Sequence, residues 1–174
     1  GEYTYLDYGL DFYAPQSFLD ENNQRTMFGW MRMRKPAEGE NWCGMLTMPR
    51  VLTQKEEHVY QNVHPNIQKL FQYESKHIDF NTPFLLKVTL QENQKISIGG
   101  LELWIKDDCL WCDRSQVSII EEKVCNLNKT PPLNYQYHLD IYYDMHIFEI
   151  YINGGYYVMS QIVYQLDESL TDIC

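Results

Sequence analysis

The segment from Asp7 to Phe18, "DYGLDFYAPQSF", combines two carboxylates with several aromatic rings near the start of the sequence. Carboxylates accept strong hydrogen bonds, and paired carboxylates can act as general acids, bases or nucleophiles. Aromatic rings add flat apolar faces and, in tyrosine and tryptophan, a polar edge. Because unpaired charges are costly in a protein interior, such a mixture is unlike ordinary core. Asp7, Asp11, Tyr13 and, further along, Trp30 are therefore the first residues to consider for chemistry.

The number and spacing of the cysteines do not favour a metal site or a redox-active thiol pair. The chain has five cysteines, an odd number that argues against a secreted disulfide framework (Cys43, Cys109, Cys112, Cys125 and Cys174). Cys109 and Cys112 form a C-x-x-C, but they lie in a strand-like segment, where positions three apart face opposite ways. No second Cys or His pair stands at zinc-finger spacing to complete a metal site with them. We predict no metal site and no cofactor.

The composition narrows the classes of partner. The chain has 174 residues and a formal net charge of -10, which repels phosphate backbones and anionic lipid. Nucleic acid and membrane surfaces are therefore excluded as expected partners. No signal peptide is evident, and no apolar run approaches the ~18 residues of a transmembrane helix.

The elements that must position these residues are mostly strands. Apolar and polar residues alternate with period two in the segments 84–90, 101–106, 137–143 and 146–152. In the last of these, Phe148, Ile150 and Ile152 share one face, and Ile147, Glu149 and Tyr151 share the other. Asn153-Gly154-Gly155 then predicts a hairpin turn. Recurring short strands of this kind indicate an antiparallel β-sandwich.

The first part of the chain has a different sequence pattern. Two strand-like segments flank a polar turn around residues 20–24, and a loop-like segment follows at residues 34–42. We therefore predict one unit over residues 1–40 and a β-sandwich over residues 41–174. Only residues 64–74 suggest a helix, with Ile67, Leu70 and Phe71 at helical spacing.

Three blocks occur in order: "LDYGLDFYAPQSFLDENNQRTMFGWM", "NWCGMLTMPRVLT" and "DMHIFEIYINGGYYVMSQIVY". Together they resemble the C-terminal portion of glycoside hydrolase family 32, the invertases, sucrose-6-phosphate hydrolases and other β-fructosidases. The last block departs from the family pattern at His146, which stands where the family has serine. The resemblance implies an all-β chain, in which an antiparallel two-sheet β-sandwich follows a remnant of the last blade of a five-bladed β-propeller.

The resemblance also implies an activity that this chain cannot perform alone. The family hydrolyses β-fructosides such as sucrose, sucrose 6-phosphate or fructo-oligosaccharides with retention, using two carboxyl groups. Its nucleophile, transition-state stabiliser and acid/base lie in N-D-P-N-G, R-D-P and E-C motifs, none of which occurs here. We therefore expect no catalytic residue in this chain and an N-terminal propeller as its partner.

For the candidate residues, the resemblance implies sugar contact. Asp11 would accept hydrogen bonds from sugar hydroxyls or orient a neighbour, and Trp30 and Tyr13 would line the sugar site. The structural alternatives are that Asp7 and Asp11 brace the turn at Gly9, and that Trp30 packs between propeller and sandwich. Trp104 and Trp111 are expected in core or interface packing.

Two other functions stay open at this point. A stand-alone sugar-binding sandwich would bind fructans without hydrolysis, and an oligomerisation module would pair with a second copy through a sheet face or edge. A homo-oligomer is thus an open expectation. Without a signal peptide, a cytoplasmic location is expected.

Overall fold

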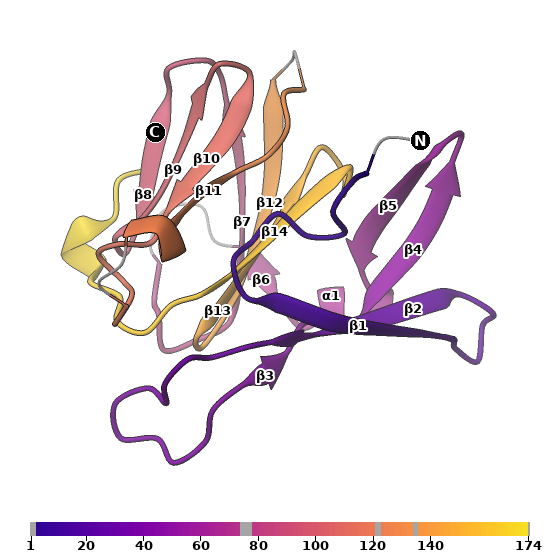
Figure 1. Cartoon of the computed structure of the whole chain (residues 1–174), viewed down its shortest axis with the longest axis horizontal. Helices are drawn as coiled ribbons and strands as arrows, with labels where there is room; N and C mark the ends of the chain where they lie inside the picture. Colours follow the sequence, from indigo (N-terminus) through magenta and orange to yellow (C-terminus); the bar gives the residue numbers. More distant parts are fainter. Residues whose placement is uncertain (1–2, 74–77, 121–122, 134–135, 174) are drawn as a thin grey trace.

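A computed structural model describes residues 3–73, 78–120, 123–133 and 136–173. Within these ranges the regular secondary structure consists almost entirely of strands, which form three sheets (Figure 1). Nearly all strand pairs are antiparallel, and the exception is the parallel pair β6–β7. The predicted all-β class is confirmed.

The first sheet begins inside the segment from Asp7 to Phe18, since β1 starts at Phe12. Its strands follow the order β1-β2-β4-β5, with the short β3 also paired to β2. The bounds are β1 Phe12–Leu19, β2 Arg25–Met31, β3 Met45–Leu46, β4 Arg50–Lys55 and β5 His58–Val63. The two strands predicted around a polar turn are thus β1 and β2. In Figure 1 the strands of this sheet lie along the bottom and the right of the molecule, outside the other two sheets.

The other two sheets form the predicted sandwich. One has the order β11-β10-β9-β8 and the other β14-β13-β12-β7-β6. Their bounds are β6 Gln72–Tyr73, β7 Phe84–Leu90, β8 Lys95–Ile98, β9 Leu101–Lys106, β10 Cys109–Asp113, β11 Leu127–Lys129, β12 Tyr137–Asp144, β13 Ile147–Ile152 and β14 Tyr157–Ile162. The four segments predicted from alternation are β7, β9, β12 and β13. Residues from both sheets share one large apolar core between them.

The predicted helix over residues 64–74 is wrong beyond Gln68. Helix α1 covers only Pro65–Gln68, and two 3-10 turns, η1 (Lys123–Cys125) and η2 (Glu168–Leu170), are the other helical pieces described. Ile67 and Phe71 pack against a core cluster without a continuing helix, and the Phe71 ring meets Tyr142 edge-on at 5.2 Å. The end of the predicted helix, Glu74, lies outside the described residues.

Strand β13 is buried on both faces, which explains its unusual sequence. Phe148, Ile150 and Ile152 lie in the sandwich core, as the predicted facing requires. Ile147 and Tyr151 lie in two smaller clusters that also contain residues of the first sheet or its flanking loops. The sandwich therefore presents an apolar outer face to the first sheet, with the carboxylate of Glu149 in its middle.

The first sheet extends further than the predicted unit of residues 1–40. Strand β4 pairs with β2, and β5 pairs with β4 along its whole length to Val63. The segment from 45 to 63 thus completes the sheet that β1 begins. Periodicity did not distinguish strands of this sheet from strands of the sandwich, because both alternate in the same way.

Gly155 provides a sharp test of how closely the two parts meet. It has a φ of 84°, and a Cβ at this position would lie 1.7 Å from the carbonyl oxygen of Gln61 in β5. The neighbouring Gly154 has a φ of 68°, and a Cβ added there would meet no atom within 4 Å, which makes this position a matched control.

We expect Gly154→Ala to lower the free energy of unfolding by about 1 kcal/mol through backbone strain alone. Gly155→Ala carries the same strain and also forces β5 away from the β13–β14 turn, so its loss should be at least about twice as large. Urea unfolding measures both. Equal losses in the two variants would show that the first sheet does not pack tightly on this turn.

Candidate functional site

Tyr13 and Trp30 form an exposed aromatic pair on the first sheet. They are direct partners across β1 and β2, and their ring centroids lie 6.2 Å apart at an interplanar angle of 66°. Tyr13 is 58% and Trp30 40% exposed, so both rings offer surface to a ligand. The guanidinium of Arg32 lies 5.7 Å from the Tyr13 ring centroid. The structure thus brings together two of the three predicted sugar-binding residues.

The backbone beside this pair is irregular. The β1–β2 register shifts between Tyr13 and Gln16, and Ala14 has a φ of 46°, which is rare for a residue with a Cβ. Bulges of this kind re-aim side chains and are frequent beside functional sites. Gly44 packs against the polar edge of Trp30, since a Cβ there would lie 2.6 Å from the indole Nε1. The orientation of Trp30 is therefore fixed by its neighbours.

Asp11, the third predicted residue, faces the sandwich instead of the exposed pair. Its carboxylate is an ion-pair partner of Arg114, which follows β10, and also accepts a hydrogen bond from the backbone N–H of Ile162 at 3.0 Å. Arg114 is itself buried and donates to the carbonyl oxygens of Cys125 and Ile162. The backbone carbonyl of Asp11 accepts from Arg32 N–H at 2.9 Å. Asp11 is therefore placed to orient the neighbouring strands.

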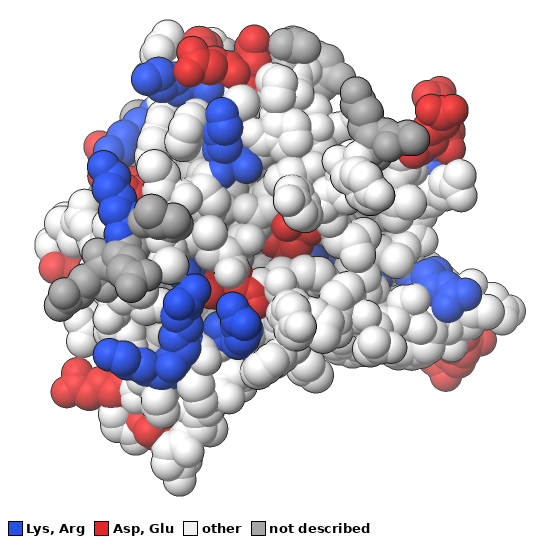
Figure 2. All heavy atoms as spheres, viewed as in Figure 1, with Lys and Arg blue, Asp and Glu red and all other residues white. Residues whose placement is uncertain are grey.

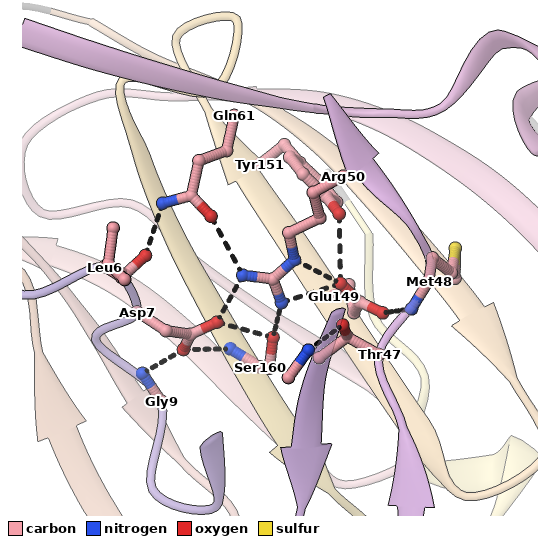
Figure 3. A network of polar contacts seen from close by, with 11 residues as sticks. Leu6, Asp7, Gly9, Thr47, Met48, Arg50, Gln61, Glu149, Tyr151 and Ser160 are labelled. Carbon is pink, nitrogen blue, oxygen red and sulfur yellow. Dashed lines mark hydrogen bonds and ion pairs between the residues drawn. The ribbon is translucent and has the colours of Figure 1, made fainter. Parts of the chain in front are cut away.

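A second buried cation, Arg50, lies at the centre of the contact between the sheets (Figure 3). All five of its N–H groups have acceptors. Nε and one terminal nitrogen donate to Glu149 at 3.0 and 2.8 Å, and the terminal nitrogens also donate to Asp7 at 2.9 Å, Gln61 at 3.2 Å and Ser160 at 2.6 Å. The acceptors come from the N-terminal segment, β5, β13 and β14. One side chain thus joins the first sheet to the sandwich.

The two carboxylates of this network are satisfied on all sides. Asp7 also accepts from the backbone N–H groups of Gly9 and Ser160 and from the Ser160 hydroxyl, at 2.7, 2.9 and 2.8 Å. Glu149 also accepts from the Met48 N–H at 2.5 Å and the Tyr151 hydroxyl at 3.0 Å. Every neighbour of these oxygens is a donor, so no carboxylate oxygen of the network is left without a partner. Backbone N–H groups supply three of these hydrogen bonds.

Burial and ion pairing shift the pKa values of the charged groups in this network in opposite directions. Burial alone would lower the pKa of Arg50, but Glu149, Tyr151 and Asp7 hold it above its ordinary value. Burial raises the pKa of Glu149, and Arg50 and the Met48 N–H oppose that rise. Burial and the adjacent Glu149 charge raise the pKa of Tyr151, so its hydroxyl stays protonated as a donor. The network is therefore built for structure rather than for proton transfer.

Residue spacing alone predicts no role for Arg50, Arg114 or Glu149. The available signal was Glu149 itself, a carboxylate in the middle of an otherwise apolar strand, which requires a buried cation opposite. The prediction that Asp7 and Asp11 brace the turn at Gly9 accounts for the hydrogen bond from the Gly9 N–H to Asp7. It does not include the ion pairs of these carboxylates with Arg50 and Arg114. No rule of spacing pairs residues 99 or 103 positions apart in the sequence.

The C-x-x-C motif is structural in the described chain. Cys109 and Cys112 are buried, unpaired residues of β10, and Cys112 lies in the sandwich core. Burial raises the pKa of both thiols, which disfavours the reactive thiolate. Among the described residues no group of three or more His, Cys, Asp or Glu side chains is arranged to hold a metal ion. Nor does the described chain contain a helix long and apolar enough to cross a membrane.

The Arg50 network generates a stability prediction. Removing one partner of a buried ion pair leaves an uncompensated charge, so Arg50→Met should lower the free energy of unfolding by about 3–5 kcal/mol. Asp140→Asn is the control, because the Lys87–Asp140 pair is 3.7 Å long and both side chains are well exposed. Its loss should stay below about 1 kcal/mol. Similar losses in urea unfolding of the two variants would contradict the role given to Arg50.

Comparison with known proteins agrees with this division of the chain. Residues 1–63 match the family model described as the glycosyl hydrolases family 32 N-terminal domain, and residues 106–173 match the one described as glycosyl hydrolases family 32 C terminal. The first match ends where β5 ends, at Val63.

Among curated relatives, the sucrose-6-phosphate hydrolase of Vibrio alginolyticus is 30% identical over 168 residues, which cover 88% of this chain and 35% of that protein. The enzyme of the same name from Staphylococcus xylosus is 28% identical, with 97% and 39% covered. The chain thus spans somewhat more than a third of the length of these relatives.

Among solved structures, the sucrose-6-phosphate hydrolase from Lactobacillus gasseri has the same fold, with a TM-score of 0.79, 22% identity, and 97% of this chain and 39% of that chain covered. The resemblance seen in three sequence blocks is therefore supported by both family models and by the fold. This chain belongs to glycoside hydrolase family 32.

Proposed function

We propose that this chain is the C-terminal part of a β-fructofuranosidase-type hydrolase that acts on sucrose 6-phosphate, sucrose or short fructo-oligosaccharides with retention. The observation that carries the proposal is the exposed Tyr13–Trp30 pair on a sheet that matches the N-terminal, glycosidase part of the family. Sucrose 6-phosphate stands first because the relatives named above are sucrose-6-phosphate hydrolases. The location we propose is the cytoplasm.

In this proposal the two parts have separate tasks. Residues up to Val63 complete the last blade of a propeller, and the following sandwich supports it. The edge strand β1 supports this division, because most of its residues are exposed in this chain. An N-terminal propeller segment, the partner we propose, would cover that edge and supply the nucleophile and the acid/base.

Tyr13 and Trp30 would form part of the sugar wall. An indole face packs on the C–H face of a sugar ring, and a phenol or indole edge can hydrogen-bond to hydroxyls. Asp11 would act as a positioning residue. Its bonds to Arg114 and Ile162 anchor the start of β1, one residue before Phe12 and two before Tyr13.

The test joins this chain to the missing part. The chain alone should hydrolyse neither sucrose nor sucrose 6-phosphate. Fused behind the N-terminal segment of the Vibrio alginolyticus enzyme, in place of the corresponding part, it should restore hydrolysis, and NMR of the first product formed should show a retained anomeric configuration.

In the fusion, Trp30→Ala should lower kcat/KM by about tenfold or more, since the ring's contact with the sugar is lost. Phe18→Ala is the matched control, because Phe18 is 49% exposed on the same sheet and stacks on Phe28. An inactive but folded fusion, or activity in the isolated chain, would refute the proposal. Equal effects of the two substitutions would refute the sugar-contact role of Trp30.

A further inference from the structure

The outer face of the β8–β11 sheet carries an aromatic ladder that the proposed function does not use. Lys95, Trp104, Trp111 and Lys129 are consecutive cross-strand partners on β8, β9, β10 and β11. Their neighbours along β9 and β10 are buried in the sandwich core, so these four side chains point outward. The predicted core packing of Trp104 and Trp111 is wrong, because they occupy the opposite phase of the strand; their packing in an interface stays a prediction.

The ladder is held in a defined geometry. The two indole rings are nearly parallel, at 7°, with centroids 6.0 Å apart. Lys95 Nζ lies 5.7 Å from the Trp104 ring centroid, and Lys129 Nζ lies 4.7 Å from that of Trp111. Trp111 Nε1 donates to the carbonyl of Lys106 at 3.2 Å, which fixes that ring. Both indoles remain partly exposed.

A hollow of about 330 Å³ adjoins Trp104 and is also lined by Asn93, Lys95, Ile105 and Lys106. This is near the lower end of the volumes of small-molecule sites, roughly 300–1,000 Å³. It combines one large flat ring with an amide and two ammonium groups. Lys95 can leave the ring at low cost, because its side chain is 52% exposed.

The charges around the hollow argue for a neutral ligand. Lys95 is already paired with Glu102 at 2.6 Å, and Glu92 accepts from the backbone N–H of Asp107 in the adjoining turn. Figure 2 shows Lys and Arg side chains concentrated over the sandwich part of the molecule, with acidic side chains among them. Interleaved signs give no preference for an anion, but they supply both donors and acceptors for hydroxyl groups.

We propose that this face binds a neutral oligosaccharide, with one sugar ring stacked on Trp104 and its hydroxyls bonded to Asn93 and Lys95. Only the choice of a fructo-oligosaccharide as the sugar rests on the proposed function. The site lies on a different sheet from Tyr13 and Trp30, so it would hold a longer substrate at a second point.

Isothermal titration of this chain with a fructo-oligosaccharide tests the site, with sucrose 6-phosphate as the anionic comparison. We expect a dissociation constant on the order of 1 mM for the neutral sugar and no tighter binding of the phosphorylated one. Trp104→Ala should weaken binding at least about tenfold through loss of the stacked face. Lys95→Met keeps the ladder's bulk and should weaken binding about threefold through a lost hydrogen bond.

Lys87→Met is the matched control, because Lys87 is 51% exposed and paired with Asp140 on the other sheet. It should leave the affinity unchanged. No binding by the unaltered chain would overturn the proposal, as would equal effects of Lys95→Met and Lys87→Met, or tighter binding of the phosphorylated sugar. If Trp104→Ala does not fold, the comparison of Lys95→Met with Lys87→Met still tests the proposal.

The same variants separate this proposal from the proposed function. Binding that is lost only in Trp30→Ala would place the sugar on the first sheet and refute the accessory site alone. An inactive fusion, combined with Trp104-dependent binding by this chain, would refute the proposed function alone.

Discussion

Burial of one guanidinium determines how the two parts of this chain fit together. Arg50 is fully buried, and a buried cation requires hydrogen-bond acceptors for all of its N–H groups. No single strand supplies them: Asp7, Gln61, Glu149 and Ser160 lie on four different segments. The first sheet can occupy only the position in which these acceptors converge. Arg114 and Asp11 add a second fixed point beside β14.

This arrangement divides the first sheet into two surfaces with different roles. Residues such as Met48 and Val63 pack on the outer face of β13 and β14. Tyr13 and Trp30 remain exposed, in an orientation set by the bulge at Ala14 and the packing of Gly44. Because the aromatic pair lies on a sheet anchored by buried ion pairs, its position is fixed relative to the sandwich, as the proposed sugar contact requires.

Much of the fold follows from local patterns in the sequence. The strands β7, β9, β12 and β13 alternate with period two, and Asn153-Gly154-Gly155 supplies the positive φ values of the following turn. The helix was overestimated because Ile67 and Phe71 pack on the sandwich at helical spacing without a helix between them. The predicted boundary near residue 40 lies in a loop. Strands β4 and β5, beyond that loop, complete the sheet that β1 and β2 begin.

The contacts around the site were less accessible to sequence reasoning. The spacing of Tyr13 and Trp30 follows from hairpin pairing, whereas the partners of Asp11 and Glu149 depend on how separate sheets dock. The phase of Trp104 and Trp111 could have been read from the alternation of Leu103 and Ile105, which places tryptophan on the opposite face. The expected reaction follows from the resemblance to the family, whereas the buried contacts that hold the strands in place are seen only in the structure.

We expect the buried ion pairs to make the first sheet and the sandwich one cooperative unit. Native-state hydrogen exchange tests it most directly, by comparing the backbone amides of β4 and β5 with those of β13 and β14. Both groups should exchange with the same opening free energy and the same dependence on urea. Exchange of the β4 and β5 amides at a much lower free energy, while β13 and β14 stay protected, would contradict it.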